Sequence, residues 1–176
     1  MNSNAIEQYA EKIHNALELK EDFGIESIVN GLGGKIETGK LSPGIWAKIS
    51  DFSWDNKVKF SITISNDTIT EERKRFSIAH ELGHLFIHMD FLDDSKWKEN
   101  CESGINFNRS EASDSRKEIE ANTFAAALLM PSNLFRDVVE ECTNSDNICD
   151  ISEVANKFKV SKQSAYYRGV NLGLWR

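Results

Sequence analysis

The sequence predicts an α+β fold in which a small three-stranded sheet packs on helices. Two changes of period along the chain carry this prediction. Apolar residues recur at helical spacing near the N-terminus and again after residue 70, as in KEIEANTFAAALLM. Between these regions, KIET, GIWAKIS and KVKFSITIS are short, rich in β-branched and aromatic residues, and bounded by the turn sequences SPG and WDN. We therefore expect three strands, mostly antiparallel, between two groups of helices.

Length and composition indicate one globular domain, or one domain with a small appendage. The chain has 176 residues, of which 40% are hydrophobic and 28% are charged. Its polar, amphipathic start differs from a secretory signal, and its most apolar run is far shorter than the roughly 20 residues of a membrane helix. We expect a cytoplasmic protein that contacts no membrane. The net charge of −7 argues against nucleic-acid binding over the whole surface.

The three cysteines give no sign of a disulfide framework. Cys101, Cys142 and Cys149 are odd in number and widely spaced, and none belongs to a CxxC pair. We expect reduced thiols in a reducing compartment rather than disulfides or a cysteine-ligated zinc site.

Capping residues and breakers place the helices. We expect helices at 4–19, 25–32, 70–90, 117–130, 132–141 and, as a final pair, 150–169. Thr70 can cap the third of these, Pro131 ends the fourth, and Asp150 with Glu153 resembles a capping box. The polar stretch 93–116 is too long for an ordinary loop, so we interpret it as disordered or functional.

Two further expectations concern the sheet and the domain boundary. The strand 58–64 alternates apolar and polar residues, which predicts one buried face and one wetter face. We divide the chain into a main domain, residues 1–141, and a C-terminal helical segment, residues 142–176, that packs on the same domain.

The stretch RFSIAHELGHLFIH carries the strongest chemical signal. On a helix, residues four apart are about 6 Å apart along the axis and about 40° apart around it, so His80 and His84 share one face. Their imidazoles can bind one metal ion, and Glu81 can act as a general base on water held by that ion. This HExxH spacing predicts a metal site, and the buried helix indicated by Phe76 and Ala79 strengthens the prediction.

A third ligand has to come from another segment. His88 lies about 12 Å along the axis from His80, which favours a supporting or helix-end role for it. A metzincin pattern using Asp90 is disfavoured because Ile87 replaces the glycine that turns the chain. The remaining candidates are Glu118 and Glu120, and helical phase alone does not choose between them.

In these motifs the sequence resembles the ImmA/IrrE family of zinc metallopeptidases. RFSIAHELGHLFIH, the following EIEANTFAAALLMP and the preceding KFSITISND occur in the family's order, and the resemblance covers about 31–131. It implies a zincin-like domain that binds one Zn²⁺ per chain through two histidines and the glutamate directly before "AN", which is Glu120 here. Glu118 stays the alternative.

The resemblance also implies a function. Family members often occur with helix-turn-helix repressors in phages, mobile elements and stress responses, or beside toxin–antitoxin modules, and several cleave or inactivate the repressor. We therefore expect a zinc-dependent endopeptidase of narrow specificity whose substrate is such a repressor. The substrate would add as a strand to an exposed sheet edge, for which 58–64 is the candidate. Arg109, Tyr166 and Tyr167 are candidates for a second oxyanion donor, and none is favoured.

The C-terminal segment leaves two other functions open. Its pattern resembles a helix-turn-helix, with Ser161 capping the second helix, but Lys159 stands where a turn glycine is usual. We favour a helical pair that packs on the main domain over a DNA-binding unit. The alternatives to an enzyme are therefore a DNA-binding regulator, and a non-catalytic zinc protein that binds a repressor or a toxin–antitoxin component.

Overall fold

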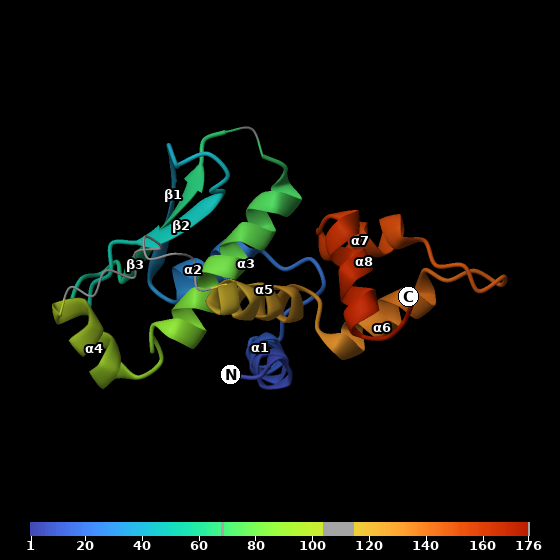
Figure 1. The fold of residues 1–176 in the computed structure, drawn as a ribbon, viewed down its shortest axis with the longest axis horizontal. Coiled ribbons are helices and arrows are strands. Elements are labelled where there is room, and N and C mark those ends of the chain that lie inside the picture. The colour runs from blue at the N-terminus through green and yellow to red at the C-terminus, as the bar shows by residue number, and fades with distance from the viewer. Residues whose placement is uncertain (68, 104–114, 176) are drawn as a thin grey trace.

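The computed structural model describes residues 1–67, 69–103 and 115–175. Along these residues, one group of helices precedes the three strands and a second group follows them, and the strands form one sheet (Figure 1). The elements are α1 (Ser3–Ala16), α2 (Ile25–Gly31), β1 (Gly34–Gly39), β2 (Ala47–Ser50), β3 (Phe60–Ser65), α3 (Glu71–His88), α4 (Asp94–Glu102), α5 (Ser115–Leu129), α6 (Ser132–Glu141), α7 (Ile151–Phe158) and α8 (Lys162–Asn171). The α+β fold class is confirmed. No helix in this described part of the chain is long and apolar enough to span a bilayer.

Helices α1, α3 and α5 form the centre of the molecule, and α5 packs against both of the others (Figure 1). Leu82, Phe124 and Leu128 are fully buried between them. The close approach of α3 and α5 depends on Gly83, where a Cβ atom would lie only 3.0 Å from the Ala121 carbonyl oxygen and 3.1 Å from its Cα. Glycine here lets two helix backbones touch, as its place within a helical motif predicts.

The sheet has the order β1-β3-β2, which differs from the expectation in two respects. First, β1 pairs with β3 in parallel and only β2 pairs with β3 antiparallel, so the sheet is mixed rather than mostly antiparallel. Second, β3 is the central strand, so the segment 58–64 is not the exposed edge that we expected. Strand β3 pairs with β1 on one side and with β2 on the other, although β2 lies between β1 and β3 in the sequence.

The predicted alternation of β3 is confirmed only in part. Phe60, Ile62 and Ile64 are buried as predicted, and Lys59 and Thr63 on the predicted wetter face are partly exposed. Ser61 on that face, however, is only 3% exposed. Val58, assigned to the apolar face, lies before the strand and is 38% exposed. Burial of Ser61 depends on tertiary packing, which alternation alone does not reveal.

The first part of the polar stretch 93–116 is ordered, which corrects the expectation of an irregular segment. It forms α4, which Asp93 caps by accepting a hydrogen bond from the Lys96 backbone N–H at 3.1 Å. Trp97 anchors the helix: it is 2% exposed and packs edge-on against Phe91 and Phe52. A single buried tryptophan therefore holds an otherwise polar helix against the sheet. Residues 104–114 lie outside the described residues.

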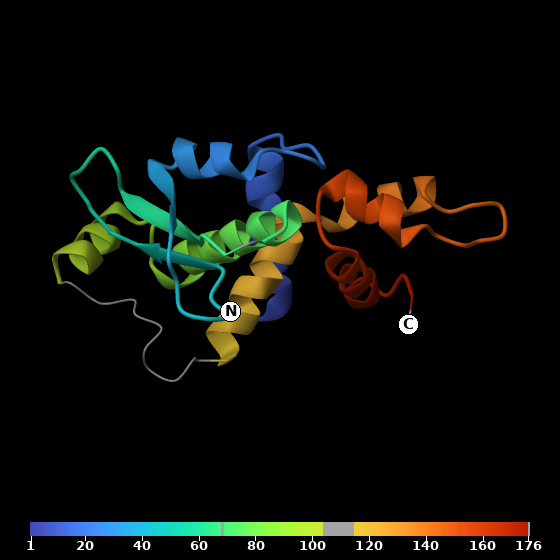
Figure 2. The same ribbon diagram turned by 90° about the horizontal axis from the view of Figure 1, so that it is seen from above.

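The C-terminal helices form a group beside the central helices, with the turn at 143–150 projecting away (Figure 2). Helix α6 belongs to this group, because Phe135 stacks on Phe158 of α7 with ring centroids 5.5 Å apart. The predicted caps Asp150 and Ser161 both accept backbone hydrogen bonds. Lys159, at the usual glycine position, adopts a left-handed conformation with φ of 51°. The division at residue 141 stays a prediction.

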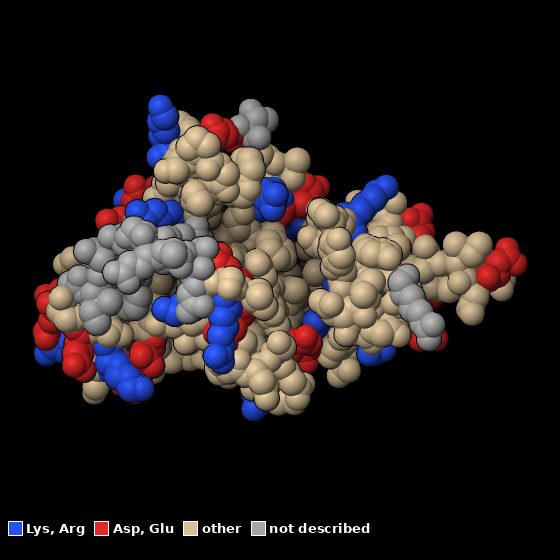
Figure 3. Space-filling model, in the orientation of Figure 1, with Lys and Arg blue, Asp and Glu red and all other residues tan. Residues whose placement is uncertain are grey.

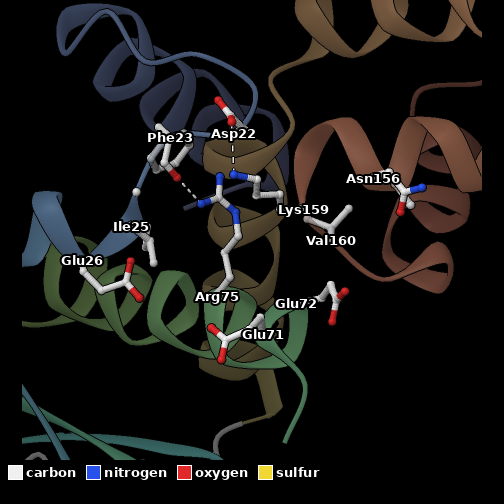
Figure 4. A pocket seen from close by; sticks show the side chains of 12 residues that line it. Asp22, Phe23, Ile25, Glu26, Glu71, Glu72, Arg75, Asn156, Lys159 and Val160 are labelled. Atoms are coloured by element: carbon white, nitrogen blue, oxygen red, sulfur yellow. Dashed lines mark hydrogen bonds and ion pairs between the residues drawn. The ribbon is translucent and has the colours of Figure 1, made fainter.

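A pocket of about 410 Å³ lies where these helices meet the start of α3 (Figure 4). Arg75 is its buried cation: the guanidinium donates to the Phe23 and Glu21 carbonyls, while Nε has no partner among the described residues. Burial lowers the pKa of Arg75 from its usual value. At the rim, Lys159 pairs with Asp22 at 3.1 Å. Arg75 thus ties α3 to the loop that precedes α2.

Candidate metal centre and active site

Three histidines line successive turns of α3 on one side of the helix. The Nε2 atoms of His80 and His84 are 3.1 Å apart, and the Nδ1 atoms of His84 and His88 are also 3.1 Å apart. Helix α3 begins at the predicted cap, since the Thr70 hydroxyl accepts from the Arg73 backbone N–H. The side chains of His80 and His84 are 12% and 11% exposed, so both imidazoles are largely shielded from water.

The carboxylate that the structure brings to both imidazoles is that of Glu118. Its Oε2 lies 3.3 Å from His80 Nε2, and its Oε1 lies 3.3 Å from His84 Nε2. Donor atoms bound to one tetrahedral zinc at about 2.05 Å lie roughly 3.3 Å from each other. The spacing of these donors, and their two-nitrogen, one-oxygen chemistry, therefore fit a zinc ion with a coordination position left for water.

Asn122 is a site residue that the sequence prediction missed. Its Oδ1 lies 2.8 Å from His80 Nδ1, the ring nitrogen opposite the one that faces Glu118. A ligand histidine commonly donates its second N–H to such an oxygen, which fixes the ring's tautomer and orientation. The signal was available in principle: Asn122 follows Glu118 by four residues, so both side chains leave α5 on the same face.

Glu120, the ligand implied by the family resemblance, faces His88 instead. Its Oε2 lies 3.0 Å from His88 Nε2, while its Oε1 contacts the Met1 amino group at 2.9 Å and Arg116 Nε at 3.3 Å. The hydrogen bond to His88, followed by that to the amino group, lowers the pKa of Glu120 to about 2. Glu120 and Glu118 diverge because residues two apart on a helix differ by about 200°.

Glu81, the predicted general base, is buried beside the sheet. It is 2% exposed, and its Oε2 accepts a hydrogen bond from the Ile49 backbone N–H at 3.0 Å. Ile49 belongs to β2, which is an edge strand of the sheet. The structure thus places the carboxylate that follows the first histidine against the edge of the sheet.

None of the three candidates for a second oxyanion donor is placed at this centre. Arg109 lies outside the described residues. Tyr166 and Tyr167 lie on α8, which belongs to the C-terminal group of helices (Figure 1). Tyr166 packs near Trp175, with ring centroids 6.4 Å apart. The two tyrosines are 39% and 55% exposed and belong to the surface of that group.

Comparison with known proteins shows what the chain is similar to. The chain is 27% identical over 133 residues to the radiation response metalloprotease IrrE of Deinococcus radiodurans, which is 71% of this chain and 36% of that protein. A solved Mycobacterium tuberculosis transcriptional regulator shares the fold, with a TM-score of 0.60 and 17% identity over 93% of this chain and 46% of the other. The chain therefore spans less than half the length of both proteins.

A sequence model of the IrrE N-terminal-like domain, a peptidase family, matches residues 43–169. This range includes the edge strand β2, the three histidines of α3 and both glutamates of α5. It also reaches into α8, so the C-terminal helices fall within the region that family members share. The chain therefore belongs to the ImmA/IrrE family of metallopeptidases, as a member of the IrrE N-terminal-like domain family.

Proposed function

We propose that the chain is a zinc-dependent endopeptidase of narrow specificity, with one ion held by His80, His84 and Glu118. The observation that carries this proposal is the meeting of three side chains. His80 Nε2 and His84 Nε2 are 3.1 Å apart, each lies 3.3 Å from one oxygen of the Glu118 carboxylate, and the buried Glu81 shares the helix of the two histidines. A third ligand from a second helix completes a set of two histidines and one glutamate. This set leaves a fourth position for water, the arrangement of a catalytic rather than a structural zinc site.

Glu81 performs the proton transfers in the proposed reaction. When bound, the ion would lower the pKa of water toward about 7 and polarise the peptide carbonyl. Glu81 takes the proton from that water as it attacks the carbonyl carbon, and then delivers the proton to the leaving amine. The Ile49 N–H holds Oε2 of Glu81, and thereby keeps the carboxylate oriented along the sheet edge.

We propose β2, rather than β3, as the strand along which the substrate lies. Strand β2 pairs with β3 on one side only, and its Ile49 N–H points toward Glu81. An extended peptide can add to such an edge through main-chain hydrogen bonds, which brings a scissile bond past the base. The requirement for an extended segment favours a flexible loop or linker of the substrate.

The proposed substrate is a helix-turn-helix transcription repressor of a phage, mobile element, stress response or toxin–antitoxin system. The family resemblance supports this choice, and so does charge. The chain carries a net charge of −7, which complements the basic surface of a DNA-binding protein. Electrostatic attraction of this kind would steer the repressor to the enzyme and weaken as salt concentration rises.

Direct DNA binding by the C-terminal helices is the less favoured function. Arg168 is buried, and Lys157 and Lys159 pair with Glu141 and Asp22 at 2.6 and 3.1 Å. On the face shown in Figure 3, acidic and basic side chains are interspersed over the described C-terminal helices. Phosphate contacts need free cations on one face, and these pairings reduce their number.

The decisive experiment uses the Glu81→Gln variant and, as the candidate substrate, a purified helix-turn-helix repressor from the same genome. The parent chain should cut that protein, and a chelator should stop the reaction. The variant should keep one zinc per chain but cleave at least about a hundredfold more slowly, because the base is lost. Cleavage by the variant at the parent rate would refute the role of Glu81, and a parent without zinc would refute the metal site.

A further inference from the structure

We infer that His88 and Glu120 form a positioning relay that fixes the ring of His84 toward the metal ion. The inference rests on the proposed zinc site and gives a role to two residues that the site does not use as ligands. The relay runs from His84 Nδ1 to His88 Nδ1, and from His88 Nε2 to the Glu120 carboxylate.

The relay has hydrogen-bond geometry at both links. The first pair of nitrogens is 3.1 Å apart, and the second link, from His88 Nε2 to Glu120 Oε2, is 3.0 Å. All three side chains are sheltered: His84 is 11% exposed, His88 is 10% exposed and Glu120 is 12% exposed. In such surroundings a hydrogen bond is stronger than in water, and an unpaired polar group is costly.

Metal coordination fixes the direction of each hydrogen bond. A neutral His84 that offers Nε2 to the ion carries its proton on Nδ1, so Nδ1 must donate to His88. His88 Nδ1 therefore accepts, and the proton of His88 lies on Nε2, where it is donated to Glu120. Each of the three side chains then has one defined role, and the His84 ring cannot flip without breaking these hydrogen bonds.

The two histidine ligands are thus oriented by different means. His80 is held by the neutral amide of Asn122, at 2.8 Å, whereas His84 is held through an imidazole backed by a carboxylate. Arg116 Nε and the Met1 amino group contact the other oxygen of Glu120 and steady the carboxylate from behind. A carboxylate behind a histidine raises the basicity of the metal-binding nitrogen, so the relay should strengthen the bond from His84 to zinc.

The test compares zinc dissociation constants, measured by competition with a chelator, for the full-length parent, His88→Leu and His88→Gln. Leucine removes the acceptor for His84 Nδ1–H, so zinc should bind about 10–100-fold more weakly. The glutamine carbonyl can accept that hydrogen bond, so His88→Gln should bind zinc more tightly than His88→Leu. Ile87→Ala, a packing change one residue away that leaves the relay intact, should keep the parent affinity.

Which of the two variants, His88→Leu or His88→Gln, binds zinc more tightly distinguishes a relay from a packing role. If His88 served only to fill space, leucine would preserve zinc affinity at least as well as glutamine, and that order would overturn the relay. Parent affinity in His88→Leu would overturn it as well. A parent chain that binds no zinc would refute the proposed metal site itself, which is a different failure. Thermal unfolding of each variant confirms that the compared chains are folded.

Discussion

Two glutamates of α5, separated by a single residue, have different surroundings. Glu118 lies 3.3 Å from both His80 and His84, while Glu120 lies beside His88. Their side chains leave the helix about 200° apart, so a single carboxylate can face the two imidazoles. The sequence motif places both residues in the right segment, but the rotation of α5 against α3 decides which of them faces the two imidazoles.

Glutamine substitutions at these two positions should therefore have unequal effects. Glu118→Gln replaces a charged ligand by a neutral amide, so the purified chain should hold well under one zinc per chain. Glu120→Gln keeps an oxygen that accepts from His88, so it should retain the ion with an affinity lowered at most about 10–100-fold. Metal analysis after gel filtration measures both. Loss of zinc from Glu120→Gln alone would make Glu120 the ligand.

At the scale of single residues, the HExxH spacing is sufficient to predict that His80 and His84 lie together. Their relation depends only on the pitch of one helix. The partners from outside that helix were harder to predict. Asn122 was missed and the choice of glutamate was open because both depend on how two helices pack, and packing phase is a long-range property.

Among the elements, the contact of α3 with α5 controls the geometry of the site. A Cβ at Gly83 would meet the Ala121 carbonyl oxygen at 3.0 Å and Phe124 Cβ at 3.3 Å. The first of these atoms is backbone and cannot rotate away. Because Glu118 is on the same helix as Ala121, any outward shift of α5 also moves the carboxylate away from the two imidazoles.

Gly83→Val should therefore weaken both the fold and the metal site. Overpacking of this kind costs about 1–3 kcal/mol, and zinc affinity should fall with it as Glu118 is displaced. Urea unfolding and chelator competition measure the two effects. Gly31→Ala is the matched control, because nothing lies within 4 Å of a Cβ built there. Parent stability and parent zinc affinity in Gly83→Val would show that the helices do not need this close approach.

The helices and strands themselves were largely predictable, and their arrangement was not. Thr70, Asp150 and Ser161 cap helices as their local sequence indicates, because capping involves only neighbouring residues. The central place of β3 depends on the parallel pairing of β1 across the intervening β2, which no local pattern specifies. Helix α4 was missed because its stability comes mainly from burying Trp97 rather than from an apolar stripe.

On the scale of the whole molecule, Arg168 fastens the C-terminal helices to the central ones. Its side chain is 1% exposed and contacts Glu7 at 3.0 Å and Glu11 at 3.4 Å, both on α1. Its Nε donates to the Met130 carbonyl at 2.9 Å, at the end of α5. One cation on α8 thus joins three helices that are far apart in the sequence.

Removal of this cation should destabilise the protein strongly. Arg168→Met removes the donor to the Met130 carbonyl and the positive charge beside Glu7 and Glu11, and we expect a loss of about 3 kcal/mol in the free energy of unfolding. Urea denaturation of the full chain measures it. Arg136→Met is the control: this exposed arginine also donates to a carbonyl, that of Leu172 at 2.8 Å, and its loss should cost less than about 1 kcal/mol. Equal losses in the two variants would show that burial gives Arg168 no special role.

The hydrogen bond from Ile49 to Glu81 has a practical consequence for testing the proposed enzyme by mutation. The donor is a peptide N–H, which is present whatever side chain occupies position 49. Alanine scanning along the edge strand would leave it intact and would report the strand as indifferent to turnover. Only a change to the main chain itself, such as proline or an ester linkage at position 49, removes the N–H that donates to Glu81, the proposed general base.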